Sequence, residues 1–256
     1  MTWKVVNKAW RAGSRVWRDT ATGDFYLTAG EGRRAVGNPR VGLYKGFAPS
    51  MDEGWTRWLL EEFGFDFASP GNAALHASDL RSKFDVIVFP DQPAEQIANG
   101  FRKGAMPDEY VGGLGDKGAA ALKAFLNDGG TVVFLNHSSA YASKLGVDVK
   151  SSMEGVSNRE FYSPGSMLNV GLDTKHPLAY GLPASIAIWS EGSPAWEGAA
   201  GGGCEVSCCR GVGVRLAAGR EAAGESRGVA GYAGGQGAGG DVRDAATISG
   251  AELSDV

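Results

Sequence analysis

A histidine and two serines follow an apolar run and are the first residues that could do chemistry. Residues 131–135 (TVVFL) are followed by Asn136, His137, Ser138 and Ser139. Hydrolases pair a serine hydroxyl with a histidine base for nucleophilic catalysis, so Ser138 and His137 are candidate catalytic residues. The flanking glycines of the G-x-S-x-G motif, which allow the strained turn that exposes such a serine, are missing. We therefore expect Ser138 or Ser139 to cap the next helix, and we keep a Ser138 hydrolase as an alternative function.

Zinc and thiol chemistry have little support in the residue types. No histidine begins the H-x-x-E or H-E-x-x-H motif of a zinc peptidase, and Cys204, Cys208 and Cys209 have no histidine near them. A glutamine amidotransferase needs a cysteine nucleophile on the turn after residues 131–135, and no cysteine stands there. We predict no metal site, no cofactor and no disulfide framework in this chain.

Acidic, amide and aromatic side chains follow three apolar runs, which are residues 40–44, 84–90 and 131–135. In open parallel sheets, ligands bind in the crevice beyond the carboxyl ends of the strands. The side chains that we expect near such a crevice are Asp52, Glu53, Trp55, Arg57, Asp91 and Asn136. Asp52 and Glu53 also suit a purely structural role, because negative charge is favoured at a helix N-terminus.

The elements that must position these residues alternate between strand and helix. The three runs are apolar at successive positions, as in strands that are covered on both faces of a parallel sheet. A helix is predicted after Ser50, which has the S-x-x-E spacing of a capping box with Glu53. Its apolar residues follow at helical spacing, which is typical of a helix with one apolar face: Trp55, Trp58, Leu59 and Phe63.

Later segments continue the pattern. Residues 116–127 predict a helix, another helix is predicted within 138–145, and strands are predicted at 167–172 and 186–189. Alternating strands and helices predict an α/β fold, with a mostly parallel sheet and helices on both of its faces.

Length, charge and hydropathy narrow the class of protein. The 256 residues carry 25 Lys and Arg against 29 Asp and Glu, and the net charge of −4 argues against a nucleic-acid partner, because phosphate binding needs a basic face. No apolar run approaches the length of a membrane span, and the N-terminus lacks the apolar core of a signal peptide. We predict no nucleic-acid or membrane partner, and a cytoplasmic location if the chain is expressed alone.

Composition divides the chain into three parts. Residues 1–38 are basic and are predicted to be a connector, and residues 39–197 hold the α/β pattern. Of the 40 glycines, 16 fall within residues 198–256, which contain no Phe, Trp, Lys or Pro. Such a segment has too little apolar area to offset the entropy lost on ordering, so we predict a disordered tail.

Several strings in the first two parts resemble one family. They are RVGLY at 40–44, SMDEGWTRW at 50–58, FDVIVFPD at 84–91, YVGGLG at 110–115, PGS at 164–166 and HPLAYG at 176–181. Together they resemble the C-terminal region of large bacterial M14-type zinc carboxypeptidases. The resemblance extends over residues 1–197, and MDEGWTRW and HPLAYG are its most specific strings.

This resemblance implies both a fold and a role. In the family, the region is a class I glutamine-amidotransferase-like domain, a flavodoxin-like three-layer sandwich without the amidotransferase nucleophile. Residues 1–38 resemble a shortened version of the connector that precedes it. The peptidase domain and its zinc would lie N-terminal to residue 1, in a parent protein that is secreted or periplasmic. No catalytic residue of the family can be placed on this sequence.

The tail does not match the family, and its composition is typical of a GC-rich gene translated out of frame. Back-translation of residues 235–256, advanced by one base, permits GKGRVVMFGMRPQYRAQSYLT, which resembles the C-terminal motif of the family. The same shift across residues 215–222 permits GWLLGEK, another family-like string. We therefore predict that residues 198–256 are an out-of-frame translation.

Three functions remain open on the sequence alone. The favoured one is a non-catalytic accessory domain of a zinc carboxypeptidase, whose partner is the peptidase domain of the parent protein. The second is an independent small-molecule or glycan-binding module that uses the strand-end crevice. The third is the hydrolase that uses Ser138 and His137.

Overall fold

The computed structural model describes residues 2–147 and shorter stretches beyond them. Those stretches are 150–151, 155–157, 159–160, 162, 164–172, 174, 179, 182–194, 196–197, 209–210, 215–218 and 228–231. None of the helices in these ranges is both long and apolar enough to cross a membrane.

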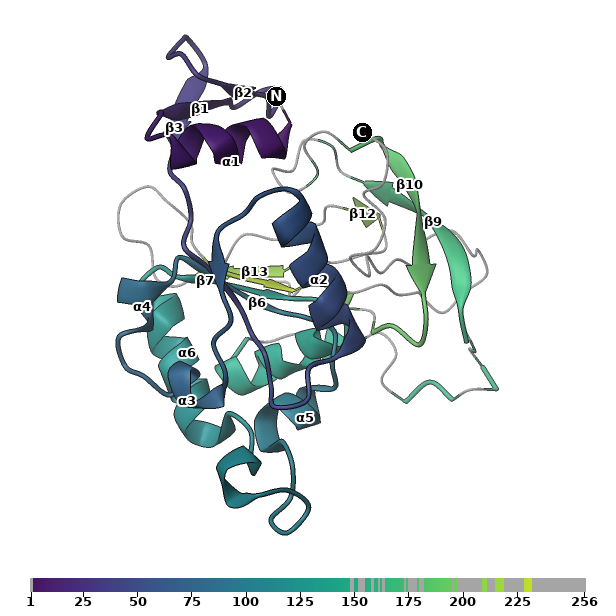
Figure 1. Cartoon of the computed structure of the whole chain (residues 1–256). Coiled ribbons are helices and arrows are strands. Elements are labelled where there is room, and N and C mark those ends of the chain that lie inside the picture. The colour runs from purple at the N-terminus through teal and green to yellow at the C-terminus, as the bar shows by residue number, and fades with distance from the viewer. Residues whose placement is uncertain are drawn as a thin grey trace.

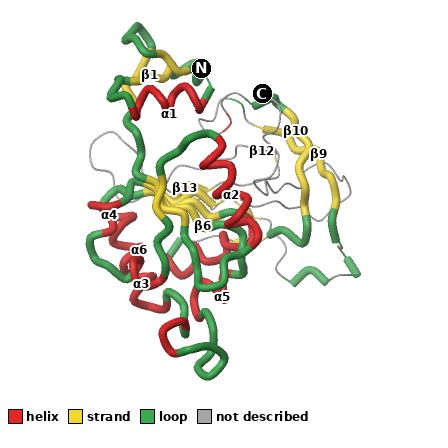
Figure 2. The backbone as a smooth tube through the Cα atoms, viewed as in Figure 1, coloured by secondary structure: helices red, strands yellow, loops and turns green. Residues whose placement is uncertain are grey.

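A six-stranded sheet lies at the centre of the fold (Figures 1 and 2). In spatial order its strands are β13 (Arg215–Ala218), β14 (Gly228–Gly231), β7 (Thr131–Phe134), β6 (Val86–Phe89), β4 (Val41–Leu43) and β5 (Phe67–Ala68). Every pairing is parallel except that of β13 with β14. The parallel strands follow the order 2-1-3-4-5 along the chain, which is the flavodoxin-like order. The predicted α/β fold with a mostly parallel sheet is confirmed, and β4, β6 and β7 are neighbours as expected.

Helices lie on both sides of this sheet, with α2 on one side and α4, α5 and α6 on the other (Figure 1). Their bounds are α2 (Met51–Glu62), α3 (Asn72–Leu75), α4 (Leu80–Lys83), α5 (Ala94–Asn99), α6 (Gly115–Asn127) and the 3-10 helices η1 (Asp108–Tyr110) and η2 (Asn136–Leu145). Ser50 is the N-cap of α2, and its Oγ accepts a hydrogen bond from the Glu53 amide at 3.1 Å, as the capping pattern predicts.

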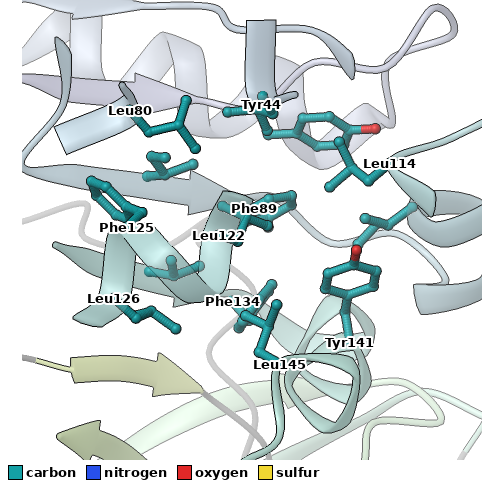
Figure 3. Close-up of a cluster of buried hydrophobic side chains, with 14 of the residues drawn as sticks. Tyr44, Leu80, Phe89, Leu114, Leu122, Phe125, Leu126, Phe134, Tyr141 and Leu145 are labelled. Carbon is teal, nitrogen blue, oxygen red and sulfur yellow. The ribbon is translucent and has the colours of Figure 1, made fainter. Parts of the chain in front are cut away.

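The main hydrophobic core fills the space between one face of the sheet and the helices α3 to α6 and η2 (Figure 3). Ile87 and Phe89 of β6 and Val132 and Phe134 of β7 point into it, and each is 0% exposed. These residues alternate along their strands because successive side chains of a strand point to opposite faces. The helices supply the rest of the core, including Leu122 of α6, which is also fully buried.

The opposite face of the sheet differs from the sequence prediction. The alternate residues of β6 and β7 are only half-buried, whereas the apolar runs predicted burial on both faces. Trp55 and Trp58 of α2 are 50% and 52% exposed, and Glu53 is the buried residue of this helix. The predicted apolar face of α2 therefore points partly to solvent. Ion pairs lie near both ends of this helix, Glu53 with Arg57 at its start and Glu62 with Lys4 at its end.

Residues 1–38 form more than the predicted connector. The helix α1 (Trp3–Arg11) packs on an antiparallel sheet of β1 (Val16–Asp19), β2 (Phe25–Tyr26) and β3 (Arg33–Val36). Val6, Ala9 and Val16 make a separate small core. Polar contacts join this unit to the C-terminal end of α2: Lys4 pairs with Glu62, Asn7 Nδ2 donates to the Phe63 carbonyl at 2.8 Å, and Arg11 pairs with Asp66.

A second, antiparallel sheet follows η2 in the chain. The strands β9 (Ser166–Leu172) and β10 (Ser185–Ser190) pair along their length and confirm the strands predicted at 167–172 and 186–189. The strand β12 (Cys209–Arg210) adds to β9, and a separate pair joins β8 (Lys150–Ser151) to β11 (Trp196–Glu197).

The predicted disordered tail, residues 198–256, falls mostly outside the described residues, as do Cys204 and Cys208. Three short pieces of it are strands, namely β12, β13 and β14. The disorder of residues 198–256 as a whole stays a prediction. β14 pairs with β7 through backbone groups, and a sheet edge can bind a strand that offers little apolar area.

Candidate functional site

The turn at the carboxyl end of β7 has unusual backbone geometry. Asn136 has φ of 50°, the one positive φ of a residue other than glycine in the described ranges. Asparagine tolerates this left-handed conformation better than most residues do. Asn136 stands at the turn where an amidotransferase would carry its nucleophile, and it is 4% exposed. The strand-to-helix elbow is thus present, and it holds an amide that is not a nucleophile.

Asp91, which follows β6, connects that strand to the elbow. Its Oδ2 accepts a hydrogen bond from Asn136 Nδ2 at 2.6 Å, and its Oδ1 accepts one from the backbone amide of His137 at 3.0 Å. The other side-chain atom of the Asn136 amide, Oδ1, is buried and has no partner within the described part of the chain. An unpaired buried acceptor costs about 1–3 kcal/mol, so this oxygen lowers the stability of the folded chain.

The imidazole of His137 lies between two acceptors. Its Nδ1 is 2.9 Å from Asp91 Oδ1, and its Nε2 is 3.1 Å from the carbonyl oxygen of Gly192. A neutral imidazole can donate only one of these hydrogen bonds, whereas the imidazolium donates both. The Asp91 hydrogen bond raises the pKa of His137 above 6.5 despite partial burial, and the carbonyl of Gly192 acts in the same direction.

A titration of His137 followed by NMR is expected to give a pKa above 6.5. Because the folded-state pKa is raised, the stabilisation is complete below the unfolded-state value and is lost as pH rises through the folded-state value. Asp91→Asn is expected to lower the measured pKa, since it removes the largest cause of the shift. Asp128→Asn, at an exposed site, is the control. A wild-type midpoint at or below 6.5 would contradict this geometry.

Ser138 is not placed as a nucleophile. Its side chain is 0% exposed, and its Oγ lies 2.7 Å from the Leu135 carbonyl oxygen and 3.1 Å from the Phe89 carbonyl oxygen. Both ring nitrogens of His137 face other acceptors, so the structure does not bring His137 and Ser138 together as a catalytic pair. The capping role expected for Ser138 or Ser139 is also wrong, because the N-cap residue of η2 is Leu135 and both serine hydroxyls donate to carbonyl oxygens.

Ser139 instead connects the elbow to the C-terminal part of the chain. Its Oγ donates to the Asn136 carbonyl oxygen at 2.5 Å and accepts a hydrogen bond from Trp196 Nε1 at 2.9 Å. Trp196 and Gly192 therefore both contact the elbow from beyond residue 190. Sequence reasoning missed both, because one contact is made by a backbone carbonyl and neither residue follows a parallel strand.

Five of the six crevice candidates separate into two groups. Asp52 belongs with Asp91 and Asn136: burial raises the pKa of Asp52, and repulsion from Asp91 raises it further. Glu53 is 4% exposed and pairs with Arg57, whose guanidinium also donates to Ser69 Oγ at 2.8 Å.

Trp55 belongs to neither group. It packs edge-on against Trp58 on the outer side of α2, with ring centroids 6.3 Å apart. The side chains that the structure brings together at the strand ends are therefore those of Asp52, Asp91, Asn136 and His137. The described residues hold no group of three or more His, Cys, Asp or Glu arranged to bind a metal.

No protein-family model matches the chain, and no curated protein matches it. Two solved structures are similar to part of it. A putative ThuA-like protein from Bacteroides uniformis is 12% identical over 61% of this chain and 58% of its own, with a TM-score of 0.35. A protein from Thermoplasma acidophilum, described as a putative subunit of GMP synthase, is 15% identical over 62% of this chain and 67% of its own, with a TM-score of 0.36. This chain thus spans less than two thirds of the first structure, and we take no residue role from either.

Proposed function

We propose that this chain is a non-catalytic accessory domain of an M14-type zinc carboxypeptidase, a protein that removes C-terminal residues from peptides. The observation that carries the proposal is the residue at the elbow: Asn136 occupies the turn after β7, and the next hydroxyl along the chain, that of Ser138, is fully buried. The strings at 50–58 and 176–181 support the family, although the second lies almost wholly outside the described residues.

In this proposal the partner of the domain is the peptidase domain of a secreted or periplasmic parent protein. Zinc would be bound there and polarise the scissile carbonyl, and the residues of this chain take no part in that step. The contribution of this chain is a rigid α/β unit. The hydrogen bonds of Asp91 join β6 to the elbow after β7, and those of His137 and Ser139 join the elbow to the segment around Gly192 and Trp196.

The purified chain is expected to show no hydrolysis of p-nitrophenyl esters or of glutamine above the buffer rate. Ser138 Oγ is buried against two carbonyl oxygens, and no base contacts it within the described part of the chain. Ser138→Ala is expected to leave that baseline unchanged and to lower stability by about 1 kcal/mol, because one hydrogen bond is lost. Turnover that Ser138→Ala abolishes would contradict the proposal and support the hydrolase.

The nucleotide sequence around the gene tests the proposed parent protein. The expected result is an upstream reading frame with the ligand motifs of a zinc carboxypeptidase, and a one-base shift that restores the family-like string across residues 235–256. If the gene has neither feature, the accessory-domain proposal and the out-of-frame account of the tail both fail.

A further inference from the structure

A loop that follows β10 lies against the elbow. The carbonyl oxygen of Gly192, within residues 191–194, is 3.1 Å from His137 Nε2. Beyond this loop, Trp196 Nε1 donates to Ser139 Oγ at 2.9 Å. The contact of Gly192 includes an imidazole, which titrates near neutral pH, whereas neither an indole nor a serine hydroxyl changes its charge in that range.

Carboxylates from three other segments lie near this imidazole. Asp91, which follows β6, lies 2.9 Å from His137 Nδ1, and Asp52 is at the start of α2. The hydrogen bond of Asp91 and, to a smaller extent, the charge of Asp52 raise the pKa of His137. Glu191 belongs to the loop itself; burial raises the pKa of Asp52, and the charges of Asp91 and Glu191 raise it further. The acidic neighbours therefore favour a proton on His137.

Loss of that proton removes one of the two hydrogen bonds of the ring. A neutral imidazole has a hydrogen on only one nitrogen, so the other nitrogen would turn a lone pair toward an acceptor. The carboxylate of Asp91 is a stronger acceptor than the carbonyl oxygen of Gly192, because it is charged. Asp91 also accepts a hydrogen bond from the His137 backbone amide at 3.0 Å, which keeps it in place. The hydrogen therefore stays on Nδ1, and the contact with Gly192 is lost.

The loop has few other contacts that would keep it in place. Glu191 and Gly192 are both exposed. The hydrogen bonds of Glu191 are local, since its carboxylate accepts from Trp189 Nε1 at 3.3 Å and its amide donates to Ser193 Oγ at 3.3 Å. No atom lies within 4 Å of the Cβ position of Gly192. The space around Gly192 is thus open, and packing there offers little resistance to movement.

We propose that His137 attaches the loop of residues 191–194 to the elbow in a pH-dependent way: the imidazolium holds the loop, and the neutral imidazole releases it. The release is local, because Trp196 stays bonded to Ser139 in both states. The loop is attached below the folded-state pKa of His137 and is released as pH rises through that value. Its release leaves the carboxylates of Asp52 and Asp91 more exposed to solvent.

The test is a titration of the whole chain from about pH 6 to about pH 9, followed by NMR. The expected result is that the amide signals of Gly192 and Ser193 titrate with the same midpoint as the imidazole of His137, while the amide of Ala187 in β10 does not. Asp52→Asn removes one of the charges that favour the imidazolium, so it is expected to move both midpoints to lower pH by the same amount.

His137→Asn imitates the released state, because its amide nitrogen takes the place of Nδ1 and nothing replaces Nε2. The amide signals of Gly192 and Ser193 are expected to lose their pH dependence in this variant. A glutamate-specific protease is expected to cut after Glu191 about tenfold more slowly in the wild type than in His137→Asn at the acid end of the range, and equally fast at the alkaline end. The reason is that the hydrogen bond from a charged donor protects only the protonated chain.

His76→Asn is the matched control. His76 follows α3, and its Nε2 contacts the Leu114 carbonyl oxygen, so the titration of the loop and its cleavage are expected to stay as in the wild type. Loop signals that do not titrate, a midpoint that differs from that of His137, or titration that persists in His137→Asn would each overturn the inference. If His137→Asn does not fold, the midpoints of the wild type and Asp52→Asn decide. The accessory-domain proposal depends on none of these outcomes, since the gene sequence and the hydrolysis assays test it.

Discussion

Phe89→Ala is expected to lower the free energy of unfolding by about 3–5 kcal/mol, which is the usual range for removing a fully buried phenylalanine. Phe89 is 0% exposed and lies at the centre of the aromatic cluster in Figure 3. Its ring centroid is 4.8 Å from that of Tyr44, 5.0 Å from that of Phe134 and 6.2 Å from that of Tyr141. None of these neighbours can fill the space without leaving its own contacts, so a cavity remains.

The control for this substitution is Val88→Ala, one residue earlier on the same strand. Val88 points to the half-buried face of the sheet, so its truncation is expected to cost only about 1 kcal/mol. Urea unfolding followed by circular dichroism measures both variants. Equal losses of stability would show that the two faces of β6 are equally packed, contrary to the structure.

Gly100→Ala is expected to destabilise the chain by about 3 kcal/mol more than a substitution at another glycine of positive φ. Gly100 has φ of 57°, and a Cβ there would lie 2.0 Å from the Gly112 carbonyl oxygen. This overlap is with backbone, which cannot rotate away as a side chain can. The backbone amide of Gly112 donates to the Phe101 carbonyl oxygen at 2.9 Å, so relief of the overlap would also break this loop closure.

Gly104→Ala is the matched control, in the same loop. Gly104 has φ of 84°, and its Cβ position has no atom within 4 Å, so it isolates the cost of the left-handed backbone, about 1–2 kcal/mol. The two variants are compared by thermal unfolding and by the amide signals of residues 100–112. Equal losses of stability in Gly100→Ala and Gly104→Ala would show that the backbone at Gly100 does not approach the backbone at Gly112 closely.

Local sequence patterns predicted the elements that lie on the central sheet. Residues 84–90 and 131–135 have few polar groups and lie between turns, and they became β6 and β7. The spacing of Ser50 and Glu53 located the start of α2, because a cap depends on neighbours within one turn of helix. Because parallel strands have their carboxyl ends at the same end of a sheet, Asp91 and Asn136 were predicted to lie close together. Their side chains are in contact.

The features that local patterns missed depend on residues far apart in the chain. The sequence by itself determined which segments are strands and which strand ends carry polar side chains, because hydrophobic periodicity and turn chemistry act over a few residues. Only the tertiary structure decided that Trp55 faces solvent and that His137 lies between Asp91 and Gly192. Those outcomes require contacts between segments up to 55 residues apart, and no spacing within one segment encodes where another segment packs.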